Sequence, residues 1–152
     1  MKLKFDKIKI WDILLLLIRV WLGYRMFTAS YSTVTGIIFH PEERVFFEKW
    51  FGEELHYPMP LFMALLAKSA ELSGGSFLLI GLFTKKAASL IAFTMFVATI
   101  TANLGKDFNI DGGFTISYML FALIFLLWGG GKFSLDYLLF KRKRVNYFEY
   151  SF

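Results

Sequence analysis

The sequence contains no cysteine, and this absence removes several classes of chemistry. Without a thiol the chain forms no disulfide, offers no thiolate nucleophile and supplies no sulfur ligand to zinc or to an iron–sulfur cluster. The two histidines, His40 and His56, do not have the short spacing of a metal-binding pair. The sequence therefore predicts no metal site, and it contains no flavin-binding motif.

Charged residues are also scarce, and apolar residues take their place. Charged residues make up 19% of the chain and hydrophobic residues 57%, whereas a soluble domain has about 25% charged residues. The apolar residues gather in four runs, each near the roughly 20 residues that a helix needs to span a bilayer. We predict one all-α domain over residues 1–152, a four-helix transmembrane bundle with spans at about 11–32, 61–83, 87–104 and 113–131.

The distribution of basic residues predicts how these spans are oriented. Eleven lysines and arginines lie before the first span, between the second and third spans, or in a basic tail at 132–152. Only Arg44, Lys49 and Lys106 lie in the two other loops. The positive-inside rule then places both termini in the cytoplasm. We expect the tail to contact anionic lipid headgroups, and no basic face for a nucleic acid is visible.

The first outer loop, residues 33–60, carries a helical pattern of its own. In the stretch "HPEERVFFEKWFGEEL", Pro41 suits the first position of a helix and Gly52 suits its end. Aromatic residues at 46, 47, 50 and 51 alternate with charges. This spacing predicts a short amphipathic helix that lies on the outer membrane surface or caps the bundle. Such a helix is either a simple lid or a gate over a site that opens outward.

Four ionisable residues fall inside the predicted spans, namely Arg19, Arg25, Lys68 and Glu71. Ionisable residues are costly in a bilayer and usually face the interior of a bundle. At 1.5 Å per residue, Arg25 and Glu71 each lie roughly 18 Å from the cytoplasmic face. We therefore expect them to lie level on antiparallel neighbours. Lys68 is one turn further outward on the Glu71 face, and the long Arg19 side chain could reach toward Glu71.

Three cations and one carboxylate leave an excess of positive charge in this centre. The excess favours a pocket for a small anionic or carbonyl-bearing ligand, with Glu71 as the catalytic group. The residues predicted to bind the substrate are Arg19, Arg25, Lys68, Tyr24 and Asn103. Other polar residues near enough to complete the pocket are Ser30, Tyr31, Ser69, Ser73, Thr94 and Tyr118. In the alternative, an arginine pairs with Glu71 only to lock two helices together.

Three segments resemble the DoxX family of small bacterial membrane proteins. They are "IRVWLGYRMF" in the first span, "ELSGGSFLLIGLFTKKAASLIAF" across the second and third, and the closing "WGGGKFSLD". The resemblance covers nearly the whole chain apart from the long outer loop. Asn103 stands where members of the family often carry a histidine. The family pattern falls on Arg19, Gly23, Glu71, Gly75, Gly81, Lys85 and Asp136.

The resemblance implies a multi-pass protein of the bacterial cytoplasmic (inner) membrane. One branch of the family is similar to the membrane subunit of a thiosulfate:quinone oxidoreductase. The resemblance therefore implies a quinone as cofactor and a partner subunit or homo-oligomer, with Glu71 relaying a proton and basic side chains stabilising negative charge. Two alternatives stay open: a non-catalytic membrane scaffold or assembly factor, and a module that binds lipid or a small anion.

Overall fold

The computed structural model describes residues 10–103 and 110–139, and within these ranges the ordered elements are all helices. The all-α prediction is therefore confirmed for this part of the chain. Most of the basic residues that predicted the orientation, among them the N-terminal lysines and the cluster at 141–144, lie outside the described residues. The elements are α1 (Ile10–Phe39), α2 (Pro41–Lys49), the π-helix η1 (Trp50–Glu54), α3 (Pro60–Ile80), α4 (Thr84–Ala98), the π-helix η2 (Thr99–Asn103) and α5 (Ile110–Trp128).

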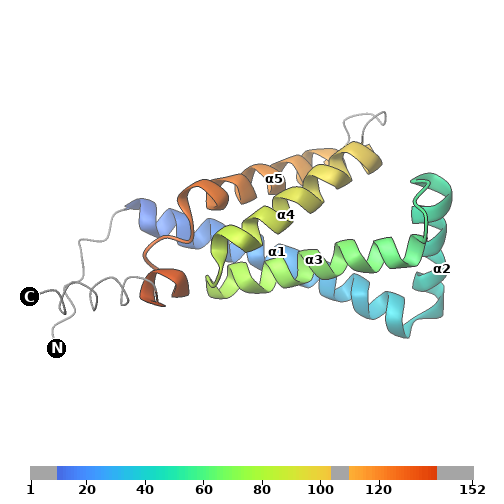
Figure 1. Cartoon of the computed structure of the whole chain (residues 1–152), viewed down its shortest axis with the longest axis horizontal. Helices are drawn as coiled ribbons and strands as arrows, with labels where there is room; N and C mark the ends of the chain where they lie inside the picture. Colours follow the sequence, from blue (N-terminus) through green and yellow to red (C-terminus); the bar gives the residue numbers. More distant parts are fainter. Residues whose placement is uncertain (1–9, 104–109, 140–152) are drawn as a thin grey trace, which may run out of the picture.

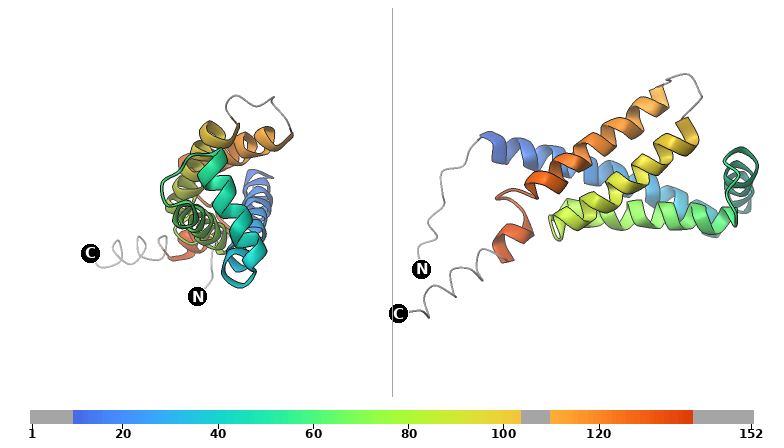
Figure 2. Two further views of the ribbon diagram at one scale, coloured as in Figure 1. Left: turned by 90° about the vertical axis from the view of Figure 1, so that its right-hand side faces the viewer. Right: turned by 45° about the horizontal axis from the view of Figure 1, so that its top comes forward.

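The four long helices form two antiparallel pairs. Helices α1 and α3 lie side by side, and α4 lies along α5 (Figure 1). The two pairs are close together near the start of α1 and diverge toward the opposite end (Figure 2). Helix α2 runs across that opposite end and packs on α1 and α3. The start of α1 and the segment after α5 therefore lie at the same end of the molecule, away from α2.

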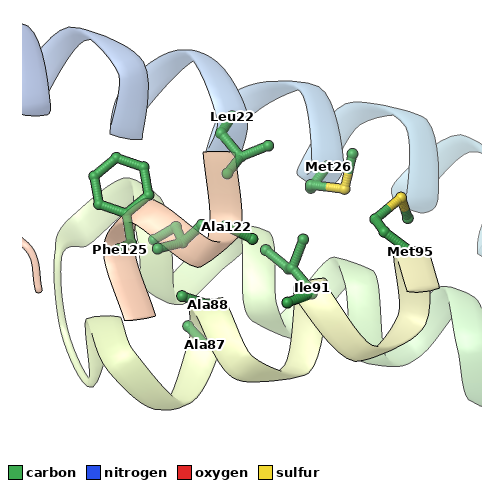
Figure 3. Close-up of a cluster of buried hydrophobic side chains, with 10 residues drawn as sticks. Leu22, Met26, Ala87, Ala88, Ile91, Met95, Ala122 and Phe125 are labelled. Atoms are coloured by element: carbon green, nitrogen blue, oxygen red, sulfur yellow. The ribbon is translucent and has the colours of Figure 1, made fainter. Parts of the chain in front are cut away.

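The main core lies where the two helix pairs meet. Leu22 and Met26 of α1 face Ile91 and Met95 of α4, and the fully buried Phe125 of α5 closes one end of the cluster (Figure 3). Alanines on α4 and α5 fill the space between these larger side chains. Small residues allow close approach of helices, which a bundle in lipid needs because apolar burial alone does not hold it together.

Three helices in the described ranges are long and apolar enough to cross a membrane. They are α1, α3 and the helix that α4 and η2 form over Thr84–Ala102. The described apolar part of α5, Gly113–Trp128, is shorter. The fourth span and the orientation of the termini therefore stay predictions.

The first helix is longer than the sequence predicted. It continues past residue 32 to Phe39, so the first part of the predicted outer loop is helical. Hydroxyl groups in this stretch bond to the carbonyls of their own helix, as Thr33 does to Ala29 and Thr35 to Tyr31. These bonds keep polar side chains compatible with a continuous helix.

The outer helix exists and begins at Pro41, as predicted. The predicted end at Gly52 is wrong, because the chain continues as a π-helix to Glu54. Phe51 is buried in a second small core with Ile37 and Ala64. This contact holds the extra turn against α1 and α3. The helix therefore caps the α1–α3 pair, whereas its predicted contact with the membrane surface stays a prediction.

Two predicted span ends were wrong because glycines in left-handed conformation end the helices earlier. Gly81, at φ 71°, ends α3 three residues before the predicted residue 83. The N–H groups of Gly81 and Leu82 close this turn on the carbonyls of Leu78 and Phe77. Gly129, at φ 75°, likewise follows the end of α5 at Trp128.

Candidate functional site

The carboxylate of Glu71 lies at the contact between α1 and α3, and the residue is 5% exposed. Its Oε2 atom accepts two hydrogen bonds of 2.8 Å each, one from Lys68 Nζ and one from Ser30 Oγ. Lys68 precedes Glu71 by one turn of α3, so the spacing correctly placed the two on one face. Ser30 reaches across from α1. We call Ser30, Lys68 and Glu71 the Glu71 cluster.

Two glycines bring the helices close enough for the short serine side chain to reach Glu71. A Cβ atom at Gly75 would lie 2.8 Å from the Phe27 nitrogen and 3.0 Å from the Gly23 oxygen. A Cβ atom at Gly23 would lie 2.9 Å from the Leu79 nitrogen. The backbones of α1 and α3 are therefore in direct contact one turn from Glu71, where larger side chains would hold them apart.

The second carboxylate oxygen of Glu71, Oε1, accepts no hydrogen bond from the described residues. Both hydrogen bonds go to Oε2, and no donor in the described ranges bonds to Oε1. The Glu71 side chain is 6% exposed and the Lys68 side chain 23% exposed. Glu71 can therefore accept a hydrogen bond or exchange a proton at Oε1. Lys68 uses one of its three N–H donors and keeps two.

The predicted proximity of Arg25 to Glu71 is wrong. Arg25 is exposed, and its Nε atom donates to the Tyr118 hydroxyl of α5 at 3.4 Å. The two residues have similar predicted depths in the membrane, but depth does not tell which way a side chain points around the helix axis. Arg25 is five residues from Ser30, which turns it about 140° away around α1. The residue therefore faces α5 and the outside of the bundle, whereas Ser30 faces α3.

The predicted reach of Arg19 toward Glu71 is also wrong. Arg19 is 2% exposed and donates to the carbonyls of Gly130 at 3.0 Å and Phe133 at 2.9 Å. A Cβ atom at Gly81 would collide with its guanidinium. Ser30 lies eleven residues, or roughly 16 Å, further along α1. The guanidinium of Arg19 thus binds the segment after α5 and does not reach Glu71.

The Asp136 carboxylate completes this second polar centre. It accepts the backbone N–H groups of Phe83 and Thr84 at 2.7 Å each, and so caps the start of α4. The same carboxylate attracts the Arg19 guanidinium electrostatically. One polar centre thus connects α1, the α3–α4 turn and the segment after α5. We call it the Arg19 junction, formed by Arg19, Gly81, Phe83, Thr84, Gly130, Phe133 and Asp136.

The remaining predicted binding residues are not brought to Glu71. Tyr24 is 57% exposed on α1. Asn103 ends η2, and its side chain lies outside the described part of the chain. Ser30 was considered in the sequence only among several polar neighbours. Its position on the stripe of α1 that also carries the buried Gly23 and Met26 is the signal that would have selected it.

Comparison with known proteins agrees with this architecture. The profile of the DoxX family matches residues 14–104, more than half of the chain. The chain belongs to the DoxX family. The curated relative "Putative oxidoreductase CatD" of Bacillus subtilis (strain 168) is 30% identical over 125 residues, which cover 80% of this chain and 93% of that protein. No solved structure matches the chain.

Membership of the DoxX family and three long apolar helices together identify a multi-pass membrane protein. The region that matches the family contains the whole Glu71 cluster. The Gly130–Asp136 half of the Arg19 junction lies beyond it. In the described residues of this DoxX protein, no three His, Cys, Asp or Glu side chains gather as metal ligands would. The Glu71 cluster is thus the candidate site.

Proposed function

We propose that this DoxX protein is the membrane subunit of a quinone-linked oxidoreductase in the bacterial cytoplasmic membrane, and that Glu71 transfers the proton. The observation that carries the proposal is that Oε1 of this buried, paired carboxylate accepts no hydrogen bond from the described residues. An ionisable group inside a membrane span marks a functional site by default. The relative from Bacillus subtilis, named as an oxidoreductase, supports the reaction class.

The chemistry suits the arrangement of the cluster. Reduction of a quinone to a quinol takes two electrons and two protons. With a quinone bound beside the cluster, Glu71 would pass protons toward it at Oε1, while Oε2 keeps its bonds from Lys68 and Ser30. Lys68 is partly exposed and bonds Oε2, so it would hold the Glu71 carboxylate in place while a second proton reaches Oε1. The cluster supplies only protons, so the two electrons for the quinone come from another subunit.

We further propose that the electrons come from a small sulfur compound such as thiosulfate, which a partner subunit oxidises. The resemblance to the thiosulfate:quinone oxidoreductase branch supports this choice of donor. The absence of cysteine from the chain means that thiol or iron–sulfur chemistry must be supplied by that partner.

The substitution Glu71→Gln tests the role of the carboxylate. Glutamine keeps the shape and can still accept bonds from Lys68 and Ser30, but it cannot carry a proton. We expect thiosulfate-dependent reduction of a short-chain quinone by native-host membranes to fall about 100-fold. The thermal midpoint of the purified protein should fall only slightly, because Lys68 is partly exposed and keeps a hydrogen bond to the glutamine oxygen. Ser30→Ala removes a bond to the same carboxylate without removing the acid, so this control should lose far less activity. A Glu71→Gln enzyme with full activity would refute the proposal.

The substitution Lys68→Met tests the ion pair. It leaves a buried carboxylate without its cation, which destabilises the fold. We expect a loss of about 1–2 kcal/mol in unfolding free energy, less than for a fully buried pair because Lys68 is partly exposed. Unfolding in detergent measures the change. Lys68→Arg keeps the charge and should recover most of the loss, and equal stabilities for the two variants would contradict the ion-pair role.

A scaffold is the second candidate function. The Arg19 junction shows that this chain uses buried charge to hold helices together. The Glu71 cluster would then do the same between α1 and α3. In that case Glu71→Gln lowers the thermal midpoint or the recovery of a partner. Deletion of the gene then leaves quinone reduction by the membranes unchanged.

A further inference from the structure

Arg25 occupies an unusual position for a charged residue. It is fifteen residues from Ile10 and fourteen from Phe39, so it lies roughly 21 Å from either end of α1. Arginine stays charged, and Arg25 lies roughly 10 Å inside the end of the predicted first span at residue 32. Its Nε atom bonds to Tyr118, but its two terminal nitrogens bond to no group in the described ranges. Their counter-charge must come from elsewhere.

The candidate membrane spans of the described chain contain no unpaired acid. Its candidate spans contain two carboxylates, Asp12 and Glu71. Asp12 pairs with Lys132 at 3.3 Å near the other end of the molecule, and Glu71 pairs with Lys68. A second copy of the chain would bring the same paired acids, and two Arg25 residues facing each other would repel. Within the described spans no carboxylate is therefore left to pair with Arg25.

The surface around Arg25 has the form of a helix-packing face. Trp21, Arg25, Ala29 and Ser32 follow one another at helical spacing and are all exposed. We call them the Arg25 stripe, which extends roughly 16 Å along α1. Two of its residues are small and allow close approach of another helix. The Ser32 hydroxyl makes no hydrogen bond in the described chain, in contrast to the neighbouring Thr33 and Thr35.

The divergence of the helix pairs leaves the outer part of this stripe uncovered. Helix α5 meets α1 where Trp21 packs against Tyr118 and Phe121, with ring centroids 5.7 Å apart in both cases. Beyond that point the α4–α5 pair leaves the α1–α3 pair (Figure 2). Ala29 and Ser32 are exposed at this level. No helix of the described chain therefore covers them.

We propose that the Arg25 stripe docks a transmembrane helix of a different protein, which places an aspartate or glutamate against Arg25. The free guanidinium nitrogens, the small residues and the length of the stripe all fit a helix. A lipid headgroup would have to leave the membrane surface, and a single small ligand would not account for Ser32. The proposal goes beyond the role of Glu71 and does not depend on it, since the two lie on different faces of α1.

Photo-crosslinking in membranes of the native host tests this interface. Ser32 is replaced by p-benzoylphenylalanine, and the matched control carries the same residue at Phe93, which is 65% exposed on α4. We expect position 32, but not position 93, to capture one integral membrane protein with an acid inside a predicted span. An adduct with a second copy, adducts with lipid or quinone only, no adduct, or equal capture from both positions would overturn the proposal.

A charge exchange then tests the acid itself. Arg25→Glu should lower the yield of the Ser32 adduct at least about 30-fold, as loss of one member of a desolvated charge pair does. Replacement of the partner's acid by arginine should restore the yield in the Arg25→Glu background. Arg44→Glu, which changes an exposed charge on α2, serves as the control. An undiminished yield in Arg25→Glu, or failure of the exchange to restore it, would overturn the pairing.

Discussion

The substitution Arg19→Gln is expected to destabilise the protein by about 3–5 kcal/mol, the usual result of breaking a buried charged network from one side. Glutamine cannot reach both the Gly130 and the Phe133 carbonyls, and it removes the positive charge that faces Asp136. For a chain of this length the loss corresponds to a fall of about 10 °C in the thermal midpoint. Thermal unfolding in detergent measures it.

Two further variants show whether the geometry of Arg19 matters. Arg19→Lys keeps the charge but replaces the planar fork with a single ammonium, so it should recover only part of the stability. Arg44→Gln makes the same chemical change as Arg19→Gln on the exposed surface of α2 and should leave the midpoint unchanged. If Arg19→Gln were as stable as Arg44→Gln, the junction would contribute nothing to the fold.

The substitution Gly75→Leu should prevent α1 and α3 from packing. Even one added carbon at this position meets backbone atoms of α1, and backbone cannot move aside as a side chain can. We expect Gly75→Ala to cost about 1–3 kcal/mol and Gly75→Leu more than that, because overpacking rises with added volume. The fraction of monodisperse protein after detergent extraction and the thermal midpoint are the measurements.

The opposing glycine provides an internal control for this prediction. Gly23 and Gly75 share one contact, so once Gly75→Ala has separated the helices, adding Gly23→Ala should cost much less than it does alone. Gly113→Ala makes the same change where nothing lies within 4 Å, and it should cost nothing. Additive losses at Gly23 and Gly75 would show that the helices do not meet at these glycines.

The apolar runs were sufficient to locate the long helices, because a segment that crosses a bilayer must be both helical and apolar. The ends of the helices were harder to predict. Gly81 looks like any small residue in an apolar run, and only its left-handed conformation makes it an end. The π-turns after Lys49 and after Ala98 depend on tertiary packing, so no local pattern predicts them.

Part of the candidate site was also predictable. Lys68 and Glu71 are three residues apart, and residues three apart lie on the same face of a helix. Their contact was therefore predictable. The hydrogen-bond partners of Arg19 and Arg25 were not predictable from their depth in the membrane. Arg19 is held by carbonyls of Gly130 and Phe133, more than a hundred positions away in the sequence. Backbone acceptors leave no signature in the side-chain sequence, which is why Arg19 was assigned to Glu71.

The Arg19 junction also sets an order for folding during synthesis. Helix α4 begins with N–H groups that are capped by Asp136, a residue made about fifty positions later on the ribosome. Until residues 130–136 have been synthesised, the N–H groups of Phe83 and Thr84 lack their Asp136 cap, and the Arg19 guanidinium lacks the carbonyls of Gly130 and Phe133. The segment after α5 therefore completes the contacts of α1 and of the start of α4 only when most of the described chain has been synthesised.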